Sequence, residues 1–65
     1  MARFSMGDHV RLRVSKRFAD LPEPIPADAE GVIAGVKPLG NDVWYDVKFK
    51  KYSPPTREIE EGDLT

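Results

Sequence analysis

The chain has 65 residues, of which 40% are hydrophobic and 32% are charged, and its formal net charge is -1. This length allows a single domain over residues 1–65, and the composition is that of a folded protein rather than a disordered tail. With no cysteine and one histidine, the chain cannot form disulfides, and we expect neither a structural metal nor a cofactor. The balanced charge excludes the overall basic field that drives nucleic-acid binding.

The N-terminal stretch MARFSMGDHV has no apolar run long enough for a signal peptide or a membrane span. Together with the absence of cysteine, this indicates a cytoplasmic protein without membrane contact. A short chain that lacks disulfides and metals buries little surface, so efficient packing or self-association must stabilise it.

The first predicted strand covers residues 9–14, in which apolar and polar residues alternate. A turn at Met6-Gly7-Asp8 precedes it, because glycine and aspartate favour turns. The period of two sends alternate side chains to opposite faces. The inward face contains Val10, Leu12 and Val14, and the outward face contains His9, Arg11 and Arg13.

A long proline-rich loop, residues 15–30, follows this strand. Its prolines at positions 22, 24 and 26 are two apart, whereas a PxxP docking ligand needs prolines three apart. We therefore interpret the loop as part of the fold, stiffened by its prolines. Phe18, Leu21 and Ile25 are expected to reach the core.

The second predicted strand, EGVIAGVK, covers residues 30–37. Alternation places Val32, Ala34 and Val36 on its core face and Ile33 on the opposite face, between two glycines. Two glycines on one face indicate strong bending or the close approach of another backbone.

A hairpin turn at PLGND leads into the clearest strand, VWYDVKFK, over residues 43–50. Its apolar face faces the core, and its other face is polar apart from one tryptophan. The prolines in YSPPT end this strand, because proline has no N–H to donate to a neighbouring strand. REIE at 57–60 predicts a short fourth strand with Ile59 facing inward. Leu64 is expected to close the core. The apolar face contains Val43, Tyr45, Val47 and Phe49, and the other face contains Trp44, Asp46, Lys48 and Lys50.

No stretch shows sustained helical periodicity, so the sequence predicts an all-β fold. We expect a single antiparallel barrel of four to five strands. The predicted core contains Val10, Leu12, Val32, Val36, Tyr45, Val47 and Phe49, with Ile59 and Leu64 closing its end.

The stretches RFSMGDHVRL, EGVIAGV, YDVKF and REIEEGDL extend this prediction. Together they resemble a family of small bacterial SH3-like barrel proteins of unknown function, over nearly the whole chain. The resemblance implies a small SH3-like barrel with a long loop after its first strand. These motifs determine a fold and carry little information about function.

The N-terminal stretch FSMGDHVR also resembles the start of the plasmid-borne type II dihydrofolate reductases. The resemblance stops short of their catalytic strand: the chain contains no glutamine, and TREIEEGD stands where the Val-Gln-Ile-Tyr motif would be. Because the catalytic strand is missing, a divergent type II dihydrofolate reductase-like protein is only the third of the functions that we consider. The residues that match are Phe4, Met6, Gly7, Asp8, Val10 and Arg11.

The sequence offers no other catalytic arrangement. Asp8 and His9 are neighbours on a strand and point to opposite faces, so they cannot form an acid–base dyad. A chain of this length also encloses no deep cleft. We predict no catalytic residues and no enzymatic activity.

The leading hypothesis is a protein-interaction barrel that acts as a homo-oligomer or as an accessory subunit of a larger complex. Trp44 is its proposed anchor, because tryptophan concentrates binding energy at interfaces and alternation places this one outside the main apolar row. The competing explanation is that loop 15–30 covers the indole ring. The predicted partner-binding residues are Trp44, Lys48, Tyr52, Arg11 and Arg13.

The alternative hypothesis is a nucleic-acid-binding barrel that uses these aromatic and basic residues, together with Lys50, as one face. Against it, the same cations can pair across strands with Glu58 and Glu60. Eleven acidic residues against ten basic ones favour that pairing.

Overall fold

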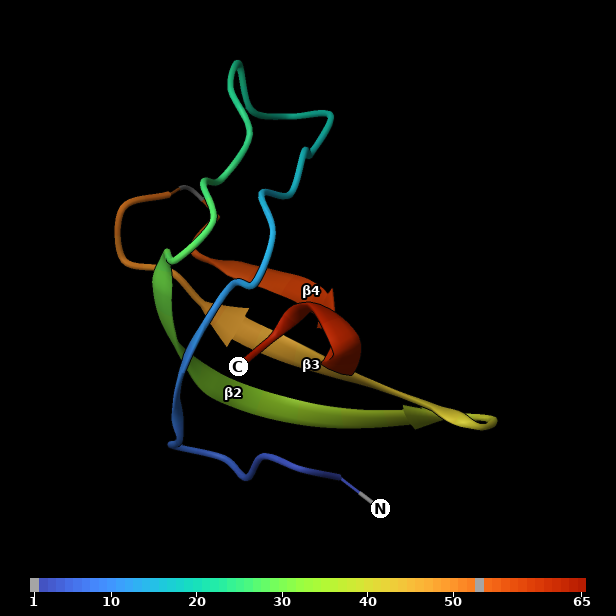
Figure 1. Cartoon of the computed structure of the whole chain (residues 1–65). Helices are drawn as coiled ribbons and strands as arrows, with labels where there is room; N and C mark the ends of the chain where they lie inside the picture. The colour runs from blue at the N-terminus through green and yellow to red at the C-terminus, as the bar shows by residue number, and fades with distance from the viewer. Residues whose placement is uncertain (1, 53) are drawn as a thin grey trace.

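The computed structural model describes residues 2–52 and 54–65. It contains one antiparallel sheet in the order β1-β2-β3-β4, and no α-helix occurs within the described residues. The prediction of an all-β chain is therefore confirmed (Figure 1). The elements are β1 (His9–Arg11), β2 (Glu30–Leu39), β3 (Asp42–Lys48), β4 (Thr56–Glu60) and the 3-10 helix η1 (Glu61–Asp63).

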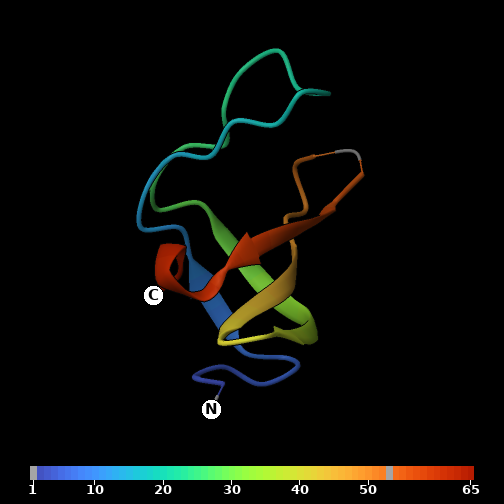
Figure 2. The ribbon, with the colours of Figure 1, turned by 90° about the vertical axis from the view of Figure 1, so that its right-hand side faces the viewer.

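The C-terminal residues return to β1 (Figures 1 and 2). The backbones of Arg11 and Thr65 exchange two hydrogen bonds of 2.9 Å. Leu12 and Leu64 form an adjacent bridge, and both side chains are fully buried. Beyond the Leu12 bridge, the backbone N–H of Arg13 donates to the carbonyl of Asp63 at 2.8 Å. Val14, which follows, is 49% exposed. Its predicted inward orientation is wrong.

A β-bulge in β2 changes which residues enter the core. Ile33 pairs with Val47, but the next pair is Gly35 with Asp46, so Ala34 is an extra residue in this strand. An inserted residue reverses the alternation, and Ile33 and Val36 therefore occupy the same face.

Ile33 is the buried residue of this strand, with 1% of its surface exposed, whereas Val36 is 37% exposed. The predicted core positions of Val32 and Val36 are wrong. Val32 lies half-buried on the outer face, where it pairs with Lys48. Val36 faces the core side but lies beyond the packed interior, opposite Tyr45.

Gly31 explains why this face of β2 turns inward. A Cβ added here would lie 2.5 Å from Cγ1 of Val47 and 3.1 Å from Cε1 of Phe49. The glycine therefore admits two core side chains that a larger residue would displace. The remaining core predictions are confirmed, including that of Ile25, and Ile33 is an additional core residue. The buried apolar residues are Val10, Leu12, Ile25, Ile33, Tyr45, Val47, Phe49, Ile59 and Leu64.

The segment between β1 and β2 is tied to the sheet by its apolar side chains. Lys16 and Ile25 form a bridge with backbone hydrogen bonds of 2.9 and 2.8 Å. Ile25 is fully buried, and Phe18 and Leu21 pack against the core, as the sequence predicts. The segment extends away from the β2–β3 turn, and the two lie at opposite ends of the molecule (Figures 1 and 2).

Arg57 on β4 holds the same segment. Arg57 is buried, with 7% of its surface exposed. Its guanidinium donates to Oδ1 of Asp20 at 2.6 Å and lies over the ring of Phe18, 5.1 Å from the ring centroid. Nε of Arg57 donates to the carbonyl of Pro54 at 3.1 Å. The pKa of Asp20 is lowered, chiefly by the hydrogen bond from Arg57. A buried cation thus links loop and sheet.

Candidate functional site

The structure disperses the predicted partner-binding residues. Trp44 lies half-buried on the outer face of β3, between Lys37 on β2 and Glu60 on β4. Lys48 shares this face but lies at the other end of β3, where it pairs with Thr56. Tyr52 lies beyond β3 and packs against Phe49. Trp44 is thus separated along the strand from the other predicted contacts of this region.

The two arginines of the first strand have partners of their own. Nη2 of Arg11 donates to Oε1 of Glu30 at 3.0 Å, and Nη1 of Arg13 donates to the carbonyl of Gly62 at 3.0 Å. The Arg11 side chain is therefore directed toward β2, and the Arg13 side chain toward the C-terminal residues. They form no shared surface with Trp44.

From the sequence, the basic residues of the alternative nucleic-acid-binding face are expected to pair with Glu58. This prediction is wrong, because Glu58 binds Lys37. Nζ of Lys37 lies 2.7 Å from Oε1 of Glu58 and 3.4 Å from Oδ1 of Asp46. The hydrogen bonds to Glu58 and then to Asp46 raise the pKa of Lys37. The single ammonium of Lys37 thus serves two carboxylates on the outer face beside Trp44.

We call residues 36–44, the turn end of the β2–β3 hairpin, the hairpin tip. Its residues 36–43 extend beyond the neighbouring strands (Figure 1). Strand β1 pairs with β2 no further than Val32, and β4 pairs with β3 no further than Trp44. Gly40, with φ of 63°, forms the turn that the sequence predicts. Leu39 is 58% exposed on the same face as Trp44, and Val36 is exposed on the other. Apolar side chains therefore lie on both faces of the tip.

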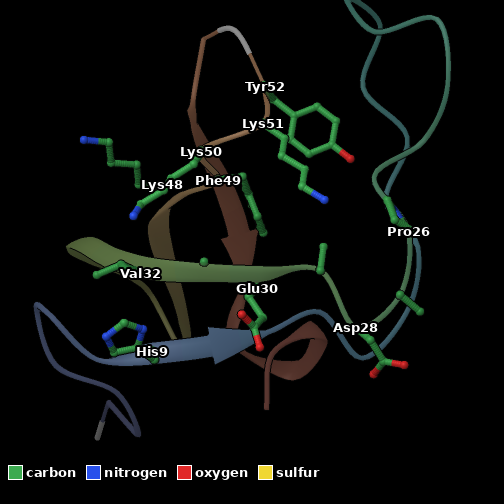
Figure 3. A pocket seen from close by; sticks show the side chains of 13 residues that line it. His9, Pro26, Asp28, Glu30, Val32, Lys48, Phe49, Lys50, Lys51 and Tyr52 are labelled. Carbon is green, nitrogen blue, oxygen red and sulfur yellow. The ribbon is translucent and has the colours of Figure 1, made fainter.

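A second feature is an open groove of about 530 Å³, which we call the basic groove. It lies between the segment 26–32 and the end of β3 with the residues that follow, 48–52, and His9 of β1 borders it (Figure 3). Lys48, Lys50 and Lys51 all line it. Within the part of the chain that the structure describes, none of these three ammonium groups has an ion-pair partner.

Tyr52 gives the basic groove an aromatic wall. Its ring contacts that of Phe49 edge to face, with centroids 6.4 Å apart and planes at 86°. Tyr52 and Pro26 also line an adjoining hollow of about 450 Å³, formed with residues 21–24 of the proline-rich segment. The tyrosine is therefore accessible from two neighbouring depressions. The sequence singles out Lys48, Lys50 and Tyr52, but it does not assign Lys51 or His9 to this surface.

A buried tyrosine fixes the N-terminal segment over the core. The Tyr45 hydroxyl donates to Oε2 of Glu61 at 2.7 Å and accepts from the backbone N–H of Phe4 at 3.2 Å. Burial, and then the bond to Glu61, raises the pKa of Tyr45. The hydroxyl of Tyr45, followed by the N–H of Arg3, lowers the pKa of Glu61. This network is structural, since each polar group satisfies another.

Two further observations concern the acidic side chains of the described residues. Among them, no cluster of three histidine, aspartate or glutamate side chains is placed to hold a metal ion. Oδ2 of Asp8 accepts the backbone N–H of Ser5 at 2.8 Å, which engages this carboxylate in the turn before β1.

No helix within residues 2–52 and 54–65 has the length and hydropathy needed to cross a bilayer. No protein-family model, curated protein or solved structure matches the chain.

Proposed function

We propose that this protein is a small SH3-like barrel that acts as a non-enzymatic protein-interaction module. The order of the elements supports the fold: a short strand, a long segment, three further strands, a 3-10 helix, and a C-terminal return to the first strand. The pairing of Leu12 with Leu64 carries this assignment, because it brings the end of the chain back to β1 and covers the core.

The hairpin tip is the proposed contact surface. The observation that supports this surface is that Leu39 is 58% exposed, on the same face as the half-buried Trp44. Full burial of a side chain of this class contributes about 1.5–3 kcal/mol, and tryptophan is a frequent anchor of interfaces. An isolated two-stranded hairpin is marginally stable in water, so contact with a partner would also stabilise the tip.

A second copy of this chain is the partner that we propose. A 65-residue domain without disulfides gains more from self-association than a large domain does. Two hairpin tips that pack face to face would remove the exposed apolar side chains of both copies from water at once. An accessory role in a larger complex is the competing outcome.

Sedimentation equilibrium over a range of protein concentrations tests this proposal. We expect a dimer whose dissociation constant rises at least about tenfold on Trp44→Ala or Leu39→Ser, because each change removes more than about 1.4 kcal/mol of burial. Val14→Ser is the matched control, since Val14 is equally apolar and 49% exposed but lies outside the tip. A chain that remains monomeric at all concentrations, with a native circular-dichroism spectrum, would refute self-association.

A further inference from the structure

We propose that the basic groove binds single-stranded nucleic acid, on a face separate from the hairpin tip. The site comprises Lys48, Lys50 and Lys51 as phosphate contacts and Tyr52 as a stacking surface, with His9 at the border. This proposal is independent of self-association. It concerns a different surface and a different class of ligand.

The distribution of ion pairs is the first observation that supports it. Several cations elsewhere in the described chain pair with carboxylates: Lys16 with Asp63, Lys37 with Glu58, and Arg57 with Asp20. Arg13 instead donates to the carbonyl of Gly62. The three lysines of the groove have no such partner within residues 2–52 and 54–65. A net charge of -1 for the whole chain therefore conceals a local concentration of positive charge. Local potential, more than net charge, determines where a polyanion binds.

The acidic residues that border the groove leave this charge largely intact. Glu30 is already paired with Arg11 at 3.0 Å. Asp28 lies at the opposite end of the groove from Lys48 and Lys50 (Figure 3). The lysine end is thus the part that a phosphate group would meet.

Tyr52 distinguishes a nucleic acid from other polyanions. Its ring faces the space between the strands and the segment that contains Pro26 (Figure 3). The adjoining hollow continues on its other side. Lys51 lies beside the ring, and Lys48 and Lys50 lie further along the groove (Figure 3). Proteins hold single strands with such a combination, in which an aromatic ring stacks on a base and lysines along a groove neutralise the phosphates. Bases in a duplex are already stacked on each other, which is why we propose a single strand.

Fluorescence anisotropy with a labelled twelve-nucleotide oligo(dT) and the matching oligo(U) tests the site. With three phosphates neutralised, log K should fall with log[salt] with a slope of about -2, or about 20-fold between 50 and 200 mM salt. Replacing Lys50 with glutamine should reduce this slope by about 0.7. Lys37→Gln is the matched control, because that ammonium is held by Glu58 and Asp46 on the outer face. It should leave both affinity and slope unchanged.

Tyr52 variants separate stacking from charge. Tyr52→Ala should weaken oligo(dT) binding at least about fivefold, whereas Tyr52→Phe should retain it, because stacking needs the ring. Should the alanine variant unfold, as judged by circular dichroism, Tyr52→Leu keeps apolar packing against Phe49 without a ring and should show the same loss.

Three outcomes would overturn the proposal. The first is no binding of either oligonucleotide at 50 mM salt and about 1 mM protein, well above typical non-specific dissociation constants. The second is binding that Lys50→Gln and Lys37→Gln weaken equally. The third is tighter binding of a labelled poly-glutamate peptide of twelve residues, which would assign the groove to acidic protein segments instead.

Discussion

Replacing Gly31 with alanine tests how the core of this small sheet is packed. The added methyl group would lie 2.5 Å from Cγ1 of Val47 and 3.1 Å from the carbonyl oxygen of Lys48. Val47 is fully buried and has no room to move aside. Overpacking of this kind costs about 1–3 kcal/mol, against a gain of about 0.4–1 kcal/mol from a less flexible unfolded chain. We expect a net loss of about 1–2 kcal/mol.

That loss is large for a domain of 65 residues. Stability of about 0.05–0.15 kcal/mol per residue gives a total of roughly 3–10 kcal/mol. An unfolding entropy of about 2.1 cal/mol/K per residue converts the loss into a decrease in Tm of about 7–15 °C. Thermal unfolding followed by circular dichroism, with urea unfolding to obtain the free energy, measures both quantities.

Gly62→Ala provides the matched control, because a Cβ there meets no atom within 4 Å and the backbone has no positive φ. This change should be neutral or slightly stabilising. Combining Gly31→Ala with Val47→Ala should cost less than the sum of the two single changes, since the removed methyl groups relieve the clash. If Gly31→Ala were as stable as Gly62→Ala, or if the double variant were additive, the proposed close packing would be wrong.

Three further predictions concern the core and the titrating groups. Ile33→Val should reduce the free energy of unfolding by about 0.5–1.5 kcal/mol and Val36→Ala by less than about 0.5 kcal/mol; the reverse order in urea unfolding would contradict the bulge. Because folding lowers the pKa values of Asp20 and Glu61 from ordinary values of 3.8 and 4.5, their stabilisation is present above about pH 5 and is lost as the pH falls through the folded values. Urea midpoints from pH 6 to 2 should show this decline, and Glu61→Gln should flatten it. Because folding raises the pKa of Tyr45, stability should also decrease as the pH rises above about 10, and Tyr45→Phe should remove much of that decrease.

Alternation was sufficient to predict much of the sheet, because side chains such as Val10 and Val47 follow a strict period of two. The inward position of Ile33 was missed, since a bulge reverses the period without a signal in the apolar pattern. The glycine at position 31 was a usable signal: the close approach that it indicates involves core side chains, so its face is the buried one.

The site was harder to predict, because ion pairs connect residues distant in the sequence. The buried guanidinium of Arg57 is paired with Asp20, which lies 37 positions away in the sequence. Glu58 pairs with Lys37 across the outer face, although alternation alone made other cations equally suitable partners. Which lysines remain without a partner therefore depends on register and on loop position. Neither can be obtained from composition or from a single strand.

Pro38 also restricts how the hairpin tip associates. From Ala34 onward, no described strand pairs with the β1 side of β2, so this edge of the sheet is open. Within a strand, proline is tolerated where its nitrogen faces away from the neighbouring strand. Pro38 pairs with Val43 on β3, so its nitrogen, which lacks an N–H donor, faces the open edge. Pro38 therefore disfavours the addition of a further strand to this edge, which is a step toward fibrils. Copies of the chain can meet through side chains at the tip without extending the sheet from one molecule to the next.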